Sequence, residues 1–459
     1  MNTKKKTGLS ARGIAVEILN KIELKGAYAE PLLDAYLAEK TSFDNRDKGL
    51  ITELVYGVLR NRNRLDWVIA GTYNGDFDSM EIPVRNILRI GIYQLLYTDR
   101  IPPFAAVNEA VITAKKIRLT AAGLVNAVLH KALTIKNDIK WPDMKIDPTR
   151  AISIIHSHPI WMVERWAELY GIDETIAVCG ENNKIPPLTV RINILRTSRD
   201  KIIPALKNEG ISAAPTIFSP EGIIVSNNPK GLRETDSFRR GLIRVQDEAS
   251  QLVAYLLDPQ PGDQVLDLCA GTGGKTLHLA ALMQNNGKIT AVDVNHKKLK
   301  LLLSEAKRLG VTIVQTMHDD SGKRNDALNQ NFDKILVDAP CSGLGTLRRN
   351  PEIRWRLRLG EIEMFKQKQK KLLQNAAGYV KPGGSLAYCV CTTTPEENEG
   401  VAFEFLEDNK EFKLKPPPKF PAELVTAEGF LRTFPHIHGT DGFFGALFVR
   451  KTRRTDHCL

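Results

Sequence analysis

Hydrophobic positions in the first third of the chain recur with the spacing of amphipathic helices. One helical face in residues 10–23 carries Ile14, Ile18, Leu19 and Ile22. Similar stripes run through residues 47–70 and 105–118, and the second of these follows Pro102-Pro103, a common helix start. Because strand-like alternation is scarce before about residue 135, this part is predicted to be an all-helical bundle.

The pattern then becomes mixed. Residues 136–150 are polar with two prolines, as in a linker. Residues 187–195 alternate like a strand, and residues 197–210 are typical of a helix closed by Gly210. The expected organisation is a helical domain at 1–140, a linker at 141–151 and a small α+β subdomain at 152–240.

From residue 241 to 453, apolar strand patterns alternate with helical ones. The predicted strands are 264–268, 288–294, 311–315, 334–340 and 385–391. Such alternation predicts an α/β domain with a parallel, doubly wound sheet and helices on both faces. Sheets of this kind bind ligands at the carboxyl ends of their strands, near the point where the strand order reverses.

Composition adds the class of partner. Hydrophobic residues make up 42% and charged residues 25%, no apolar run approaches a membrane span, and the N-terminus lacks a secretory signal. Six cysteines without paired spacing favour free thiols in a reducing cytoplasm. Lys plus Arg exceed Asp plus Glu by 64 to 53, which favours a polyanionic partner.

One segment concentrates this positive charge. Residues 348–358 read RRNPEIRWRLR, in which arginines surround Trp355. Arginine suits phosphate contacts and an aromatic ring suits base stacking. Contacts with RNA are therefore expected from Arg348, Arg349 and Arg354.

A glycine-rich turn follows the first predicted strand of the α/β domain. Residues 264–280 read QVLDLCAGTGGKTLHLA, which nearly matches a phosphate-binding loop and a dinucleotide-binding loop but fits neither. Asp293 ends the next strand, where an acid accepts hydrogen bonds from ribose hydroxyls. An acidic, glycine-lined pocket suits S-adenosylmethionine, a nucleoside with a positive tail and no phosphate. The alternative role for Asp293 is to cap the following helix.

Two cysteines end two of the predicted strands. Cys341 follows the strand 334–340, and Cys391 ends the strand 385–391 before the polar loop TTTPEENEG, which is expected to turn toward solvent. In a doubly wound order these strand ends are neighbours, so the thiols are expected to meet near the glycine loop. Packing is the plain alternative. The spacing of Cys389 and Cys391 does not match structural zinc sites, so no metal is expected and a nucleophile is favoured.

These motifs together resemble a known family. The stretches GLIRVQDEASQ, DLCAGTGGKT, DAPCSGLGTLRRNPEIRW, YCVCTTTPEENEG and DGFFGALFVRK follow in the order found in RNA cytosine-5 methyltransferases. Residues 105–116 and 121–133 resemble the helical RNA-binding domain of NusB. The resemblance implies an all-α NusB-like bundle, a small α+β subdomain and a Rossmann-like class I methyltransferase domain.

The resemblance also implies roles for individual residues. Cys391 falls on the nucleophile, Cys341 on the cysteine that assists product release, and Asp338 on a catalytic acidic residue that also contacts cofactor. The other positions that fall on S-adenosylmethionine contacts are Cys269, Ala270, Gly271, Thr272, Gly273, Gly274, Lys275, Asp293 and Asp319. Asp320 competes with Asp319 for its role because the two are adjacent.

Two positions depart from the family pattern, and rival functions remain. Thr272 replaces a proline of the cofactor loop, and Val390 replaces a threonine before the nucleophile. The resemblance implies a monomeric cytoplasmic enzyme that methylates carbon 5 of a cytosine in small-subunit 16S ribosomal RNA. A transfer RNA substrate, a DNA cytosine methyltransferase and a catalytically idle RNA-binding assembly factor are the alternatives.

Overall fold

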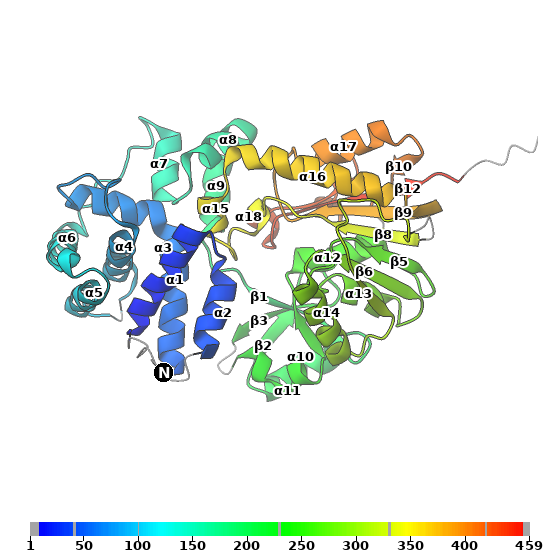
Figure 1. Ribbon diagram of the computed structural model, residues 1–459, viewed down its shortest axis with the longest axis horizontal. Coiled ribbons are helices and arrows are strands. Elements are labelled where there is room, and N and C mark those ends of the chain that lie inside the picture. The colour runs from blue at the N-terminus through cyan, green and yellow to red at the C-terminus, as the bar shows by residue number, and fades with distance from the viewer. Residues whose placement is uncertain are drawn as a thin grey trace, which may run out of the picture. The chain divides into compact units, whose positions relative to one another are not determined.

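The chain folds into two compact units, which are described separately. The computed structural model describes residues 9–39, 43–99, 101–227, 231–328, 332–417 and 420–452 (Figure 1). Unit 1 comprises Met1–Ile185 with Leu347–Leu357, and unit 2 comprises Pro186–Thr346 with Arg358–Leu459. None of the described helices is long and apolar enough to cross a membrane.

Unit 1 is helical, as predicted. Its helices are α1 (Ala11–Lys25), α2 (Ala29–Glu39), α3 (Asn45–Thr72), α4 (Ile82–Tyr97), α5 (Pro103–Ile117), α6 (Ala122–Ile135), α7 (Pro148–Ile155), α8 (Ile160–Tyr170), α9 (Ile172–Asn182) and α15 (Ile353–Arg356). The predicted stripe of α1 is fully buried, since Ile14 and Ile18 are 0% exposed. Ser10 accepts a hydrogen bond from the Gly13 amide and so caps the start of α1.

A segment from the second half of the sequence completes unit 1. Residues 347–357 are inserted between two stretches of unit 2 in the sequence, yet they pack with the helices of unit 1. The Trp355 indole donates to the Leu59 carbonyl at 2.8 Å, and the Ala29 amide donates to the Glu352 carboxylate at 2.9 Å. The compact units therefore divide at Ile185/Pro186 and at both ends of this segment, whereas the sequence pattern placed a linker at 141–151.

Unit 2 begins with a small antiparallel sheet that corresponds to the predicted α+β subdomain. Its strands are β1 (Leu188–Ile192), β2 (Ser212–Pro215), β3 (Gly222–Asn227) and β4 (Ile243–Val245), in the order β2-β3-β1-β4. Helices α10 (Arg199–Asn208) and α11 (Asp236–Arg239) belong to the same region. Gly210 follows α10 with a φ of 81°, a conformation that suits the expected glycine stop.

The larger sheet of unit 2 has the strand order β10-β12-β9-β8-β5-β6-β7, and β11 pairs with β12. Its strands are β5 (Gln264–Asp267), β6 (Lys288–Asp293), β7 (Val314–His318), β8 (Phe332–Asp338), β9 (Val380–Val390), β10 (Phe412–Leu414), β11 (Leu431–Thr433) and β12 (Phe443–Arg450). The central strands β5 and β8 are parallel neighbours, with β9 beside β8. This order places the ends of β8 and β9 side by side, as predicted from the alternation of strands and helices.

Helices cover both faces of this sheet. Helices α12 (Glu248–Leu257), α13 (Thr276–Leu282) and α14 (His296–Leu309) lie on one face, and α16 (Leu359–Ala377) and α17 (Glu399–Asp408) lie on the other (Figure 1). The short helix α18 (Pro435–His438) precedes β12. The expected α/β architecture, with helices on both faces of the sheet, is confirmed by this layered arrangement.

The sheet is mixed rather than wholly parallel. β12 runs antiparallel to β9, β10 and β11. β7 starts at Val314, three residues later than predicted, because it pairs with β6 in the register Ile289 to Val314. The sequence pattern missed β12 because its residues FFGALFVR are nearly all apolar and therefore lack alternation.

Two glycines bring the ends of two loops together in unit 2. The Gly442 amide donates to the Gly345 carbonyl at 2.7 Å, and the Gly345 amide donates to the Cys391 carbonyl at 3.1 Å. A Cβ atom added at Gly345 would lie 1.9 Å from the Gly442 carbonyl oxygen. Only glycine fits at position 345, and the contact fixes the backbone that carries Cys391.

Replacing Gly345 by alanine is expected to destabilise unit 2 by about 1–3 kcal/mol, because the added methyl group forces two backbones apart. Thermal unfolding monitored by circular dichroism measures the effect. Gly360→Ala is the matched control, since a Cβ at this glycine of α16 meets nothing within 4 Å. Equal melting temperatures for the two variants would contradict the proposed close packing.

Candidate active site

A buried carboxylate, that of Asp267, bonds across the glycine loop that joins β5 to α13. Asp267 is 1% exposed and accepts a hydrogen bond from the Thr276 hydroxyl at 2.7 Å. Burial raises the pKa of Asp267 to about 7. Gly271 and Gly273 have φ values of 57° and 82°, which side-chain-bearing residues rarely adopt. The sequence therefore needs glycine to turn the chain sharply at the end of β5.

Asp293, at the end of β6, lies against this loop. Its carboxylate accepts hydrogen bonds from the Gly271 amide at 2.9 Å and from the Asn295 amide at 2.7 Å. The capping of α14 is performed by Asn295, which accepts from the amides of Lys297 and Lys298. The alternative role for Asp293 as the cap of α14 is therefore wrong, and the residue is free to act at the loop.

Asp319 and Asp320 follow β7 and differ in their surroundings. Asp319 is half-buried, and its carboxylate accepts from the Asn325 side chain at 2.5 Å. Asp320 is exposed, and its side chain accepts from the Gly322 amide at 3.0 Å within a local turn. The more fixed carboxylate at this strand end is that of Asp319.

Lys275 and Asp338 form an ion pair that joins the glycine loop to the end of β8. The Lys275 Nζ atom lies 2.6 Å from an Asp338 carboxylate oxygen. Burial alone would lower the pKa of Lys275, but attraction to Asp338 and to the sulfur atoms of Cys391 and Cys389 raises it above its ordinary value. A fixed positive charge, that of Lys275, is therefore held at the edge of the sheet where Cys391 lies.

The two cysteines predicted to meet are in contact. The Sγ atoms of Cys341 and Cys391 lie 3.4 Å apart, at the ends of β8 and β9. The hydrogen bond with Cys391, together with burial, raises the pKa of Cys341 well above that of a free thiol. The two thiols therefore form one hydrogen-bonded pair, in which either sulfur atom can donate.

The other cysteines near these strand ends are Cys389 and Cys269, and burial affects both thiols. Cys389 is 0% exposed, and burial raises its pKa well above that of a free thiol. Burial, together with the nearby carboxylates, also raises the pKa of Cys269. Of the cysteines expected at this edge of the sheet, only Cys341 and Cys391 form a pair of interacting thiols.

The arginine cluster lies in a different setting from the one expected. Arg348 is 2% exposed and pairs with Glu181 at 3.0 Å. Arg354 is 0% exposed and donates to the Asn183 side chain at 2.7 Å. These guanidinium groups are bonded inside unit 1, and their burial argues against the expected phosphate contacts, whereas Arg349 is half-buried. Sequence alone gave no sign of this, because arginines beside a tryptophan suit a protein core as well as RNA.

Two arginines of the small sheet brace the glycine loop, and sequence reasoning missed both. Arg191 of β1 donates to the Gly274 carbonyl at 2.8 Å, and Arg244 of β4 donates to the Thr272 carbonyl at 2.9 Å. Burial lowers the pKa of Arg191 to about 9. The only signal in the sequence was a charged residue inside each of two otherwise apolar strand patterns.

The loop after Cys391 also differs from expectation. Thr392, Thr394, Glu397 and Asn398 are all buried, although their sequence is polar and was expected to face solvent. The Glu397 carboxylate accepts from the Ser342 amide at 2.9 Å and from the Thr394 hydroxyl at 2.8 Å. The loop is therefore an internal structure that connects the two cysteine positions.

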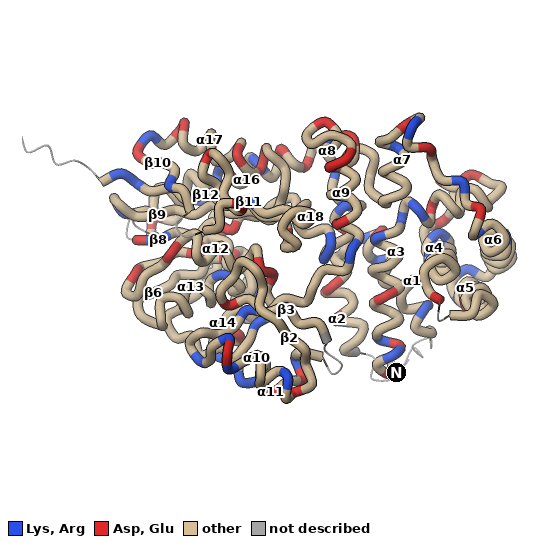
Figure 2. Tube along the Cα trace, turned by 180° about the vertical axis from the view of Figure 1, so that it is seen from behind, with Lys and Arg blue, Asp and Glu red and all other residues tan. Residues whose placement is uncertain are grey.

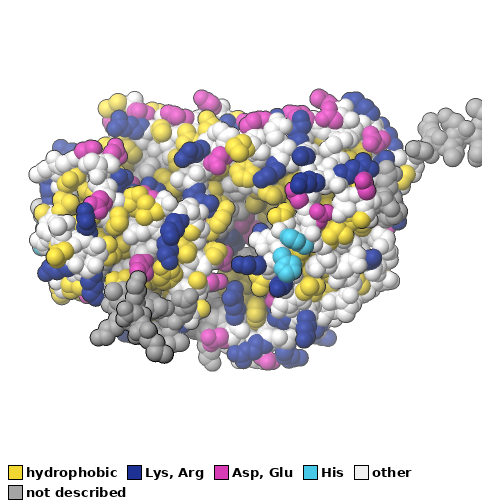
Figure 3. Space-filling model, in the orientation of Figure 1, with side chains coloured by type: hydrophobic (Ala, Val, Ile, Leu, Met, Phe, Trp, Pro, Cys, Tyr) yellow, Lys and Arg dark blue, Asp and Glu magenta, His cyan; other side chains and the backbone are white. Residues whose placement is uncertain are grey.

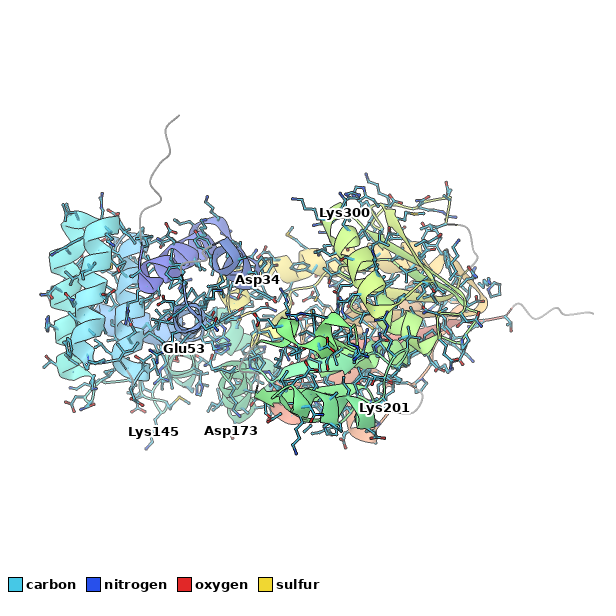
Figure 4. All side chains as sticks on the ribbon, turned by 90° about the horizontal axis from the view of Figure 1, so that it is seen from below. Asp34, Glu53, Lys145, Asp173, Lys201 and Lys300 are labelled. Carbon is cyan, nitrogen blue, oxygen red and sulfur yellow. The ribbon has the colours of Figure 1, made fainter. Side chains whose placement is uncertain are left out.

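Positive charge remains on the surface of unit 2. Lys297, Lys298 and Lys300 in the first turns of α14 are exposed, and lysine and arginine residues mark α10 and α14 in Figure 2. Lys201 and Lys300 point away from the ribbon in Figure 4. Histidine side chains lie beside lysine or arginine side chains on the face shown in Figure 3. These surfaces suit an anionic partner.

The residues at this edge fit S-adenosylmethionine. Added Cβ atoms at Gly271 and Gly274 would meet nothing within 4 Å, so the loop is open on the side where a ligand would lie. Asp293, Asp319 and Asp338 follow three parallel strands and offer carboxylate oxygens to hydroxyl groups and to a positive amino group.

Family models match the chain in three places. The model for the 16S rRNA methyltransferase RsmB/F matches residues 254–449, the NusB family matches residues 9–134, and an RsmF/B-like ferredoxin-like domain matches residues 158–230. A probable ribosomal RNA small subunit methyltransferase B from Bacillus subtilis strain 168 is 34% identical over 95% of this chain and 97% of its own. The chain belongs to the 16S rRNA methyltransferase RsmB/F family.

Further relatives of this RsmB/F chain cover the same length. A ribosomal RNA small subunit methyltransferase B from Escherichia coli O6:K15:H31 is 31% identical over 96% of this chain and 98% of its own. The crystal structure of PH0851 is 31% identical, covers 97% of this chain and all of its own, and superposes with a TM-score of 0.81.

A solved relative also bears on the cofactor. The structure of NSun6 from Pyrococcus horikoshii with SFG is 26% identical and covers 62% of this chain and 97% of its own, with a TM-score of 0.56. Membership of the methyltransferase family RsmB/F, together with this neighbour, confirms the prediction that S-adenosylmethionine is the cofactor.

In this RsmB/F chain, replacing Asp293 by alanine is expected to raise the dissociation constant for S-adenosylmethionine about tenfold or more, because a charged hydrogen-bond acceptor is lost. Isothermal titration calorimetry measures the change. Asp320→Ala is the control, since this exposed carboxylate bonds within its own turn. Unchanged affinity in Asp293→Ala would remove Asp293 from the cofactor site.

Proposed function

We propose that this protein methylates carbon 5 of a cytosine in 16S ribosomal RNA through a transient bond between Cys391 and the base. The observation that carries the proposal is the contact of 3.4 Å between the sulfur atoms of Cys341 and Cys391, beside the Lys275–Asp338 ion pair. Two thiols at neighbouring strand ends next to a cofactor loop suit covalent catalysis, in which one difficult step becomes two easier ones.

The first step belongs to Cys391. Its thiolate adds to carbon 6 of the cytosine, which breaks the conjugation of the ring and moves electron density onto carbon 5. Lys275, paired with Asp338 at 2.6 Å, places a positive charge at this edge of the sheet, where it can balance the charge of the attacking sulfur. When bound, S-adenosylmethionine supplies the methyl group, as an electrophilic carbon on a sulfonium, that carbon 5 receives.

Asp338 and Cys341 act on the base around this step. The Asp338 carboxyl group, held by Lys275, is suited to hold the amidine edge of the cytosine and to favour the protonated adduct. After methylation, a base removes the proton from carbon 5, its electron pair restores the double bond between carbons 5 and 6, and the bond between carbon 6 and the Cys391 sulfur breaks with Cys391 leaving as a thiolate. Cys341 lies beside that sulfur and assists this release.

The substrate class rests on the relatives and on charge. Relatives that match nearly the whole chain carry the name ribosomal RNA small subunit methyltransferase B. The net charge of +11 favours a polyanion. Since the reacting base must leave its stack to meet two half-buried thiols, the target cytosine is expected in a single-stranded or readily opened RNA site. A cytoplasmic monomer remains the expected state of the protein.

Mapping of 5-methylcytosine tests the proposal. Bisulfite sequencing of total RNA from cells with and without the gene is expected to show one 16S cytosine that loses its methyl group in the deletion. Restoration by the wild-type gene, and not by a Cys391→Ala gene, ties the mark to this site. Loss of a mark in transfer RNA alone, or no change in any RNA, would contradict the proposal.

A further inference from the structure

A buried carboxylate lies between the two cysteine-bearing loops. Glu397 is 0% exposed, six residues after Cys391. One carboxylate oxygen accepts from the Ser342 amide and the Gln369 side chain, both at 2.9 Å. The other accepts from the Thr394 hydroxyl at 2.8 Å and is 3.4 Å from the Thr392 hydroxyl.

Two of these contacts involve residues that are adjacent in sequence to the two cysteines. Ser342 directly follows Cys341, and Thr392 directly follows Cys391. The hydroxyl groups of Ser342 and Thr392 also lie 2.7 Å apart. Gln369 of α16 donates in addition to the Pro340 carbonyl at 3.0 Å, on the other side of Cys341. Both loops are therefore fixed to a single side chain.

No lysine, arginine or histidine pairs with this carboxylate among the residues that the structure describes. A buried carboxylate without a cation must be stabilised by hydrogen-bond donors, and those donors come from both loops and from α16. Because each carboxylate oxygen of Glu397 accepts from donors on these segments, movement of either loop would leave one buried oxygen without one of its hydrogen bonds. The arrangement resists separation of the loops.

We infer that Glu397 is a positioning residue that sets the separation of the Cys341 and Cys391 sulfur atoms. This inference rests on the proposed function. Glu397 is fully buried and acts through the Ser342 amide and the hydroxyl groups of Thr392 and Thr394. Methyl transfer and product release both require the two sulfur atoms at a fixed separation, so both steps depend on the Glu397 side chain.

Two substitutions at position 397 distinguish the length of the side chain from its charge. Glu397→Asp keeps the charge but is shorter by one methylene group, ~1.5 Å, and cannot bond to both loops. Glu397→Gln keeps the reach: its oxygen accepts from Ser342 and Gln369, and its amide donates to the Thr394 hydroxyl. Aspartate is therefore expected to be the more damaging change, which is the reverse of what a purely electrostatic role predicts.

Kinetics give the first test. Glu397→Asp is expected to lower kcat about 10²-fold, because a displacement near 1 Å at reacting groups has that effect, while KM for RNA and the cofactor dissociation constant change by less than about threefold. Glu397→Gln is expected to keep kcat within about fivefold of wild type. Glu399→Asp is the matched control, since this nearby acid pairs instead with Arg432.

A second measurement reads the sulfur positions without cofactor or RNA. Diamide oxidises two neighbouring thiols to a disulfide and is itself reduced to the hydrazine, with both thiol protons transferred to it. Wild type and Glu397→Gln are expected to form the Cys341–Cys391 disulfide at similar rates. Glu397→Asp is expected to form it at about one tenth of that rate or below. Peptide mass spectrometry identifies the bond.

The outcomes divide cleanly. Wild-type kcat and oxidation rate in Glu397→Asp would overturn the inference, as would a Gln variant that is slower than the Asp variant in both assays. An Asp variant that does not fold leaves the decision to Glu397→Gln, whose near-normal rates support the inference and whose 10²-fold loss of kcat overturns it. If wild type makes no 5-methylcytosine, the proposed function fails instead, and the oxidation rates still decide the positioning role.

Discussion

Replacing Cys391 by alanine is expected to abolish methyl transfer, with kcat reduced by at least about 10⁴-fold. The reason is that carbon 5 of cytosine is a poor nucleophile until sulfur adds to carbon 6, and Cys391 is the residue assigned to that addition. Transfer of a tritiated methyl group to 16S RNA transcribed without modifications measures the loss. Cofactor affinity should remain close to wild type, since the side chain of Cys391 is assigned to the base.

Cys389→Ala is the matched control for this variant. Cys389 lies two residues before Cys391, near the end of β9, and is 0% exposed in the apolar core. Its loss should lower stability modestly and leave the rate per folded molecule near that of wild type. Appreciable methylation by Cys391→Ala, with the product located at carbon 5, would remove covalent catalysis by this residue.

Replacing Cys341 by alanine is expected to trap the protein on its RNA. The sulfur of Cys391 still adds to the base and the methyl group is still transferred, but the assistance to release is lost, so turnover falls by about 10²-fold or more. The trapped complex should survive denaturing gel electrophoresis as a band of higher mass that disappears on treatment with ribonuclease.

The double variant Cys341→Ala/Cys391→Ala is the control, because it lacks the sulfur that forms the bond and should give no such band. A band in Cys391→Ala, and none in Cys341→Ala, would reverse the two roles.

Much of the site followed from the sequence because strand ends in parallel sheets carry function. The neighbour relation of β5, β8 and β9 brought Cys341 and Cys391 together as expected, and the glycine loop with Asp293 formed as predicted. These features depend on local pattern and on a topology that few alternatives satisfy.

Other features depend on long-range packing that local pattern does not encode. The antiparallel strand β12 is apolar along most of its length, so its sequence carries no alternation. Arg354 and Glu397 are charged residues with fully buried side chains, and burial of charge occurs only where distant partners supply hydrogen bonds. Asn183, for example, bonds to Arg354 although the two residues are far apart in the sequence.

The segment Leu347–Leu357 has a consequence for how the protein is made. Ribosomes deliver α1 through α9 first, then most of unit 2, and only afterwards the residues that fill the gap beside Leu59 and Ala29. Domains usually fold in the order of their synthesis. Here the helical unit is completed by the indole of Trp355 only after translation has passed both the glycine loop and Cys341.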